Sequence, residues 1–257
     1  MIVAVPAGIV ALVCILSGAE ALAAFVLVVG GVALYEFYAL TDHVHPVHLA
    51  GFLVLAALIG TGLWGDQFQL VAVIAAAFPA VFLLGLMTAR REHATLGMAA
   101  TLFGAFWIGI PLAHAIFLER LPHGDKVIID VLLGTFVGDT FAYAGGRLFG
   151  RHKLAPRLSP NKTQEGLVAG IVGATLTVWF AGLYQSWISG QNAILLGLAV
   201  ALVAPLGDLF ESFIKRDFGL KDSGRAFGAH GGAMDRADAA LFTLVVGYYV
   251  WFSMAAL

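Results

Sequence analysis

The sequence predicts an all-α, polytopic integral membrane protein with about nine transmembrane helices. Only 12% of the 257 residues are charged and 60% are hydrophobic, whereas a soluble domain carries about 25% charged residues. Because so few charges cannot cover a water-exposed surface, lipid is the expected solvent for most of the chain. The apolar stretches are continuous and do not alternate with polar residues, which favours membrane helices over the strands of a barrel.

Nine apolar stretches follow one another, each near the ~20 residues that a helix needs to cross the hydrocarbon layer. The first and third are the short ones. We expect one membrane domain over residues 1–257, with N-terminal spans in 1–126 and catalytic spans and cytoplasmic loops in 127–257. The predicted spans are residues 2–18, 21–40, 48–64, 70–87, 97–118, 127–149, 166–184, 193–214 and 237–257. The glycine pairs Gly30-Gly31 and Gly145-Gly146 suit close helix packing.

The basic residues predict the orientation. Of the 14 Lys and Arg residues, two lie in loop 88–96, five in loop 147–165 and five in loop 215–236. Nine spans place these three loops on one side, which the positive-inside rule makes cytoplasmic. The N-terminus is then inside and the C-terminus outside. The net charge of −2 argues against a nucleic-acid partner.

Acidic residues lie in or at the ends of the spans beside the two most basic loops. Acidic groups at membrane depth are costly, so they usually have a partner or a function. Carboxylates surrounded by cations suit a metal ion and a polyphosphate. The alternative is that the loops are positive-inside anchors with local ion pairs. The acidic residues are Asp130, Asp139, Asp208, Glu211, Asp235 and Asp238.

Spacing and glycine content make the prediction more specific. On a helix, Asp208, Ser212 and Lys215 share one face, with Glu211 adjacent. Further on, charged residues alternate with glycines, which let backbone amides approach a phosphate closely. The runs are Lys221-Asp222-Ser223-Gly224, His230-Gly231-Gly232 and Asp235-Arg236. The chain has no phosphate-binding P-loop, no His-Glu-x-x-His zinc motif and no serine nucleophile elbow.

Two stretches resemble the signature of the phosphatidate cytidylyltransferase (CDP-diacylglycerol synthase) family. They cover residues 139–166 and 207–238. The first includes Asp139, Ala142-Tyr143, Gly146-Arg147, Ser159-Pro160, Lys162-Thr163 and Glu165-Gly166. The second includes Gly207-Asp208-Leu209, Glu211-Ser212, Lys215-Arg216, Lys221-Asp222, Phe227-Gly228, His230-Gly231-Gly232, Asp235-Arg236 and Asp238.

The resemblance implies a reaction in which CTP and phosphatidic acid give CDP-diacylglycerol and pyrophosphate. It also implies a requirement for Mg²⁺, a second cation such as K⁺, a homodimer, and a place in the bacterial inner membrane with the active site on the cytoplasmic face. The lipid phosphate is itself the anionic nucleophile, so the protein must chiefly neutralise and align two anions.

Residue roles follow from this chemistry. We expect Asp208 and Asp235 to be the main metal ligands and Asp222 the next. The alternatives are ion pairs of Asp222 with Lys221 or Arg225, and of Asp208 with Lys215. The expected catalytic set is Asp208, Ser212, Lys215, Asp222 and Asp235. The expected substrate-binding set is Asp139, Lys162, Arg216, Lys221, His230 and Arg236.

Three other functions would each require different sequence features. A transporter would also place charges in spans, but it would not need the ordered Lys-Asp and His-Gly-Gly runs. A CDP-alcohol phosphotransferase needs an Asp-x-x-Asp-Gly start and a final pair of aspartates four apart, whereas Asp235 and Asp238 are three apart. A CTP-dependent kinase of a polyprenol or phytol type alcohol uses the same nucleotide and is the alternative function.

Overall fold

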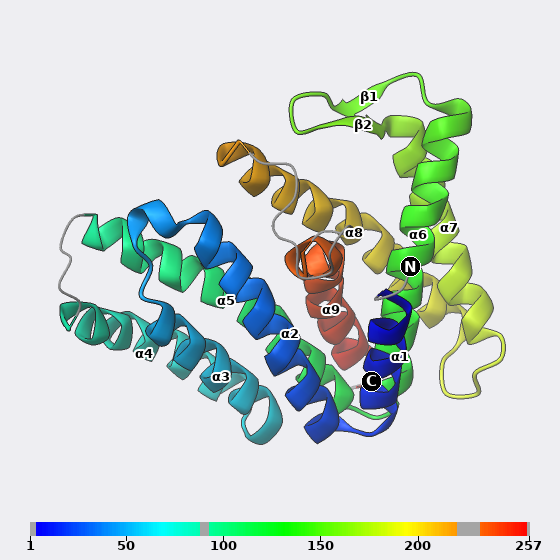
Figure 1. Cartoon of the computed structure of the whole chain (residues 1–257). Helices are drawn as coiled ribbons and strands as arrows, with labels where there is room; N and C mark the ends of the chain where they lie inside the picture. Colours follow the sequence, from blue (N-terminus) through cyan, green and yellow to red (C-terminus); the bar gives the residue numbers. More distant parts are fainter. Residues whose placement is uncertain (1–3, 88–92, 220–231, 256–257) are drawn as a thin grey trace. The chain divides into compact units, whose positions relative to one another are not determined.

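The computed structural model describes residues 4–87, 93–219 and 232–255 (Figure 1). This part of the chain forms nine α-helices, one short 3₁₀ helix and one β-hairpin. The helices are α1 (Ala4–Leu16), α2 (Ala19–Leu40), α3 (His48–Trp64), α4 (Gln67–Leu86), α5 (Ala94–Glu119), α6 (Gly124–Phe149), α7 (Gln164–Gly182), α8 (Gly190–Asp217) and α9 (Met234–Ala255), with the 3₁₀ helix η1 (Asp42–Val44) after α2. The strands are β1 (Lys153–Ala155) and β2 (Ser159–Thr163).

These elements confirm the predicted all-α, multi-pass membrane fold. Within the described ranges, seven helices are long and apolar enough to cross a membrane. The other two, α1 and α3, have 13 and 17 residues and coincide with the stretches that the sequence marks as short. At about 1.5 Å per residue, α3 is roughly 26 Å long. The number of nine crossings therefore stays a prediction.

The hairpin was not predicted. It lies in the basic loop between α6 and α7, where β1 pairs antiparallel with β2 through Lys153–Thr163 and Ala155–Ser159. The amide of Leu158 donates to the carbonyl of Ala155 at 3.1 Å and closes the turn. Strands this short carry no alternating hydrophobic pattern, so the sequence signal for them is weak.

The described residues pack as two compact units. One contains α1 to α4 and most of α5, together with the first residues of α9. The other contains α6, the hairpin, α7, α8 and the rest of α9. We describe each unit separately.

The first unit is built around α5, whose apolar residues are mostly buried. Phe37 of α2 packs against Phe103 and Trp107 of α5, with ring centroids 5.6 and 6.0 Å apart. One residue further along α2, the hydroxyl of Tyr38 donates to the carbonyl of Thr101 at 2.9 Å, and both residues are buried. Large aromatic side chains and a satisfied buried hydroxyl thus join α2 to α5.

The second unit depends on a close approach of α6 and α7, which lie side by side in Figure 1. Small residues recur every four positions on α6, at Gly134, Gly138 and Ala142, and the last two of these face Gly170 of α7. A Cβ added at Gly170 would lie 2.9 Å from Cβ of Ala142 and 3.1 Å from the carbonyl oxygen of Gly138. Small residues at such spacing let membrane helices approach closely where no hydrophobic effect drives association.

The glycine pairs behave differently from one another. An added Cβ at Gly145 would collide with Ala169, and one at Gly30 would lie 2.6 Å from Leu112, so both confirm the expected packing role. At Gly31 an added Cβ would meet nothing within 4 Å. The two positions of a pair point in different directions around a helix, so they meet different surroundings: an added Cβ at Gly146 would lie 2.9 Å from the Thr163 hydroxyl, whereas one at Gly31 would face open space.

This contrast gives a test of the helix contact. We expect Gly170→Ala to cost about 1–3 kcal/mol by overpacking, which lowers the thermal midpoint in detergent by roughly 5 °C for a chain of this size. The matched variant Gly31→Ala should leave the midpoint unchanged or raise it slightly. Differential scanning fluorimetry of both proteins measures this, and equal midpoints would contradict the close α6–α7 contact.

Candidate active site

The hairpin is fixed at the base of α7 by two polar contacts. Thr163 ends β2 and caps α7, because its hydroxyl accepts from the amide of Gly166 at 3.1 Å. The Glu165 carboxylate accepts from the amides of Arg151 and His152 at 3.1 and 3.2 Å, and contacts the His152 ring at 2.6 Å. These bonds hold both ends of the hairpin, so the side chains of β2 take fixed places beside the helices.

A cavity of about 550 Å³ opens between α6, α7, α8 and the hairpin. One part of its wall carries polar side chains, namely Asp139, Tyr143, Arg147, Asn161, Lys162 and Asp208. Another part is formed by small or weakly polar residues, namely Gly134, Thr135, Gly138, Gly170, Ala174, Ala201 and Ala204. The volume is that of a pocket for a small ligand. The wall suits a molecule with a charged and an apolar part.

Lys162 and Asp208 form an ion pair in this cavity. Lys162 comes from β2 and Asp208 from α8, and both side chains are only partly exposed. Asp139 of α6 lies within electrostatic range of both, as well as of Asp238 on α9. Three carboxylates from three helices therefore lie within electrostatic range of one another, and two of them are near the Lys162 ammonium group.

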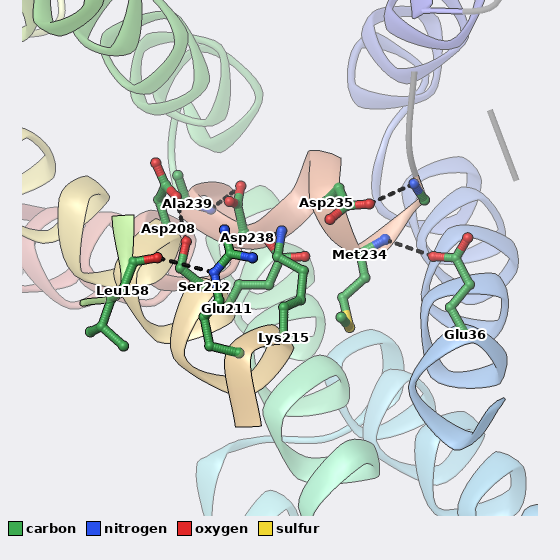
Figure 2. Close-up of polar contacts among 12 residues, drawn as sticks. Glu36, Leu158, Asp208, Glu211, Ser212, Lys215, Met234, Asp235, Asp238 and Ala239 are labelled. Atoms are coloured by element: carbon green, nitrogen blue, oxygen red, sulfur yellow. Dashed lines mark hydrogen bonds and ion pairs between the residues drawn. The ribbon is translucent and has the colours of Figure 1, made fainter. Parts of the chain in front are cut away.

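The last turns of α8 extend the polar cluster (Figure 2). Ser212 donates to Asp208 at 3.5 Å, so these two side chains share a face as predicted. Lys215 pairs with Glu211 at 3.1 Å, where Glu211 is 1% exposed. Asp238 of α9 lies near Glu211, and it is within electrostatic range of Asp208 and Lys215 as well.

The pairing of Lys215 corrects one alternative drawn from the sequence. The sequence also allows an ion pair of Asp208 with Lys215. In the structure, Asp208 pairs with Lys162 and Lys215 pairs with Glu211. The two pairs together with Asp139 and Asp238 comprise four carboxylates and two ammonium groups. If all are ionised, two negative charges are left over.

Arg216 contacts the hairpin turn. Its Nε donates to the carbonyl of Leu158 in the hairpin turn at 3.3 Å, and the side chain is exposed. This bond ties the C-terminal end of α8 to the hairpin that carries Lys162. A contact of Arg216 with a substrate phosphate stays a prediction.

Asp235 and Arg236 lie in the first turn of α9, in the part that packs with the first unit. The carboxylate of Asp235 accepts from the amide of Gly232 at 2.7 Å (Figure 2). Arg236 is exposed. Lys221, Asp222 and His230 lie outside the described residues. The predicted sharing of one ion by Asp208 and Asp235 is untested, because the two residues belong to different units.

The donor atoms in the cluster fit a hard divalent cation. Carboxylate and hydroxyl oxygens are the ligands that Mg²⁺ prefers. Within the described ranges, however, no three His, Cys, Asp or Glu side chains are arranged to hold a metal ion. A substrate phosphate would then have to supply further oxygen ligands, as is usual for Mg²⁺.

Comparisons with known proteins identify the family. The sequence matches the cytidylyltransferase family over residues 1–254. The chain belongs to this family. It is also 35% identical to a phosphatidate cytidylyltransferase of Staphylococcus aureus over 77% of this chain and 75% of that protein. The proteins of the same name from Staphylococcus saprophyticus and Staphylococcus epidermidis are 32% and 35% identical, over 76% and 71% of this chain and 74% and 69% of theirs.

Three residues of the polar wall were not among the catalytic and substrate-binding residues expected from the sequence. Arg147 donates to the hydroxyl of Tyr143 at 3.1 Å, and both line the polar wall. Asn161 lies on the same wall, one residue before Lys162. A signal existed for Tyr143 and Arg147, which follow Asp139 at intervals of four on α6 and so share its face. Asn161 had none, because the strand that carries it was not predicted.

The Lys215–Glu211 pair gives a second test. Lys215→Met should cost about 3 kcal/mol, since removing one partner leaves a buried carboxylate uncompensated, and the thermal midpoint should fall by roughly 10 °C. The double variant Lys215→Met/Glu211→Gln should recover much of the loss. Lys126→Met, an exposed cation in the first turn of α6, serves as the control in thermal melts. A single variant as stable as the control would contradict the pairing.

Proposed function

We propose that this protein transfers the cytidylyl group of CTP to phosphatidic acid and releases pyrophosphate, at the cytoplasmic face of a bacterial inner membrane. The observation that carries the proposal is the two-part cavity within membrane-spanning helices. Its polar wall suits the phosphates of a soluble nucleotide, and its small, weakly polar wall suits the part of a lipid next to its head group. The named relatives support the same activity.

The reaction joins two anions. A phosphate oxygen of the lipid attacks the α-phosphorus of CTP, the new P–O bond forms, and the bond to the β-phosphate oxygen breaks, so that pyrophosphate leaves. No protein nucleophile is needed. The work of the site is to hold both phosphates in line and to neutralise their charge.

The residues of the second unit meet these needs. Lys162 already faces the cavity, and its ammonium group can move from Asp208 to a phosphate oxygen. Arg147 presents a guanidinium group on the same wall, a shape that matches phosphate oxygens. Asp139 has room in the cavity to accept from a nucleotide hydroxyl.

Mg²⁺ is the proposed cofactor, with Asp208 and Asp235 as its main ligands and Asp222 as the next. When bound, it would neutralise phosphate charge and favour in-line geometry. Ser212, which donates to Asp208, and Lys215, which pairs with Glu211, would hold these two carboxylates in place. Contacts of Lys221, His230 and Arg236 with the substrates, a second cation such as K⁺ and a homodimer remain predictions.

The activity has a direct test. With Mg²⁺, the purified protein should convert labelled CTP and phosphatidic acid to CDP-diacylglycerol and pyrophosphate, and a chelator should abolish turnover. Asp208→Asn and Asp235→Asn should each lose at least about 100-fold, since a carboxylate ligand is replaced by a weaker one. Asp66→Asn, in the exposed cap of α4, is the matched control and should keep wild-type turnover.

Product identity decides between this activity and its alternative. A CTP-dependent lipid kinase would give CDP and a phosphorylated alcohol, which chromatography separates from CDP-diacylglycerol. Near wild-type rates in both aspartate variants would refute the ligand assignment while leaving the activity itself established.

The orientation is tested by labelling. In a Cys14→Ser background, Lys153→Cys in the exposed hairpin and Ser186→Cys in the exposed α7–α8 connection place single thiols at opposite ends of α7. A membrane-impermeant maleimide should label Ser186→Cys in intact spheroplasts, and Lys153→Cys only in inverted vesicles. The reverse pattern would place the cavity on the outer face.

A further inference from the structure

The β-hairpin of the second unit depends on contacts outside its own ladder. β1 has three residues and β2 has five, and their register is irregular between Lys153 and Ala155. A two-stranded hairpin of this kind is marginally stable on its own. Yet β2 carries Lys162, the cation that pairs with Asp208 in the cavity. The place of this ammonium group is therefore set by the contacts that hold the hairpin to the ends of α6 and α7 (Figure 1).

The Glu165 carboxylate, in the first turn of α7, binds the chain segment that enters β1. One of its oxygens, Oε2, accepts from the amides of Arg151 and His152 at 3.1 and 3.2 Å. The other, Oε1, lies 2.6 Å from Nδ1 of His152. Because an ionised carboxylate can only accept, the His152 ring carries a proton on Nδ1 and donates it. A single side chain thus binds three donors from two successive residues.

A carboxylate suits this arrangement and a carboxamide does not. Both carboxylate oxygens are acceptors, with about four lone-pair sites between them. A glutamine has one acceptor oxygen, and its amino group would face donors that it cannot bind. Hydrogen bonds to a charged acceptor are also roughly twice as strong as neutral ones. The Glu165 side chain is 26% exposed, so its charge stays partly solvated and the usual penalty of a buried anion is avoided.

The bound segment leads directly to Lys162. The amide of Gln164 donates to the carbonyl of His152 at 2.9 Å, so the His152 backbone is bonded through both its amide and its carbonyl. The next residue, Lys153, is the ladder partner of Thr163, which directly follows Lys162. A shift of the chain at His152 would therefore displace the ladder and the strand that carries Lys162.

Thr163 limits how such a displacement can occur. A Cβ added at Gly146, Gly150 or Gly166 would approach the Thr163 side chain to between 2.8 and 3.0 Å, so this side chain fits closely among three glycines. The end of β2 is thus held by packing, and the start of β1 is held by Glu165. Without the Glu165 carboxylate, the hairpin would turn about Thr163 and redirect the neighbouring Lys162 side chain.

We propose that Glu165 is a positioning residue, which holds the start of β1 against α7 so that the Lys162 ammonium group stays in the cavity to meet a substrate phosphate. The inference rests on the proposed function for the role of Lys162. Glu165 belongs to neither the expected catalytic set nor the expected substrate-binding set, and it is not among the residues that line the cavity. It acts through Lys162.

The first test needs neither CTP nor lipid. An acylating reagent, followed by mass spectrometry, measures the reactivity of the Lys162 amine, which the ion pair with Asp208 protects. Glu165→Ala should speed acylation of Lys162 at least about tenfold, the factor expected from losing one hydrogen bond to a charged group. Glu165→Gln, which keeps one acceptor oxygen, should give an intermediate rate. The control Asp66→Ala removes a carboxylate that caps α4 in the other unit, and it should leave the rate unchanged.

The second test is a double-mutant cycle on turnover. Glu165→Ala and Lys162→Met should each lower kcat/KM for CTP about 100-fold, since a small misplacement of a contact group can cost this much. Because Glu165 acts through Lys162, the double variant Lys162→Met/Glu165→Ala should match Lys162→Met within about twofold. A merely structural role would instead multiply the two losses, to about 10⁴-fold. Asp66→Ala should keep wild-type turnover.

Three results would overturn the proposal. They are a wild-type acylation rate of Lys162 in Glu165→Ala, an equal rise of that rate in Asp66→Ala, and multiplied losses in the cycle. If Glu165→Ala fails to fold, Glu165→Gln replaces it in both tests, with smaller changes in the same directions. A wild-type protein that makes no CDP-diacylglycerol would refute the proposed function, and the acylation rates would then decide the positioning role alone.

Discussion

The ion pair of Lys162 and Asp208 is the interaction on which the site of the second unit depends. Asp139 and Asp238 lie within electrostatic range of Asp208, and their mutual repulsion is strong in a medium poor in water. The Lys162 ammonium group offsets part of this repulsion, and it comes from a strand rather than from the membrane helices. The Thr163 cap at the start of α7 holds that strand, so a local helix start positions a charge at the centre of the cavity.

The cavity and the tight helix contact have a common origin. Small residues on α6 allow α7 to approach closely, and the same absence of side chains leaves space between these helices and α8. Gly138 and Gly170 serve both purposes, since each lies in the contact and lines the cavity. The same glycines therefore provide both tight helix packing and space for a ligand. A substitution at Gly138 or Gly170 affects both properties.

The sequence predicted the helices well and the connections poorly. In lipid, every backbone amide must be bonded within the segment, so a continuous apolar stretch such as 193–214 has few alternatives to a helix. The face shared by Asp208 and Ser212 followed from helical spacing alone. The partner of Asp208 did not, because Lys162 lies 46 positions earlier on an unpredicted strand. Lys215 pairs with Glu211, four residues earlier on the same helix. Side chains four apart are neighbours on a helix, so this pair is favoured over the Asp208–Lys215 pair.

If the carboxylates of the second unit are ionised, their surplus negative charge would account for the proposed cation. Asp139, Asp208, Glu211 and Asp238 lie near the ammonium groups of Lys162 and Lys215. A bound nucleoside triphosphate and lipid phosphate would add further negative charge. Water screens such charges poorly within a membrane protein. If Lys162 moves toward a phosphate, Asp208 loses its partner at the same moment. A divalent cation bound to both Asp208 and the phosphates, as proposed, would offset both charges, so substrate and metal would then bind cooperatively.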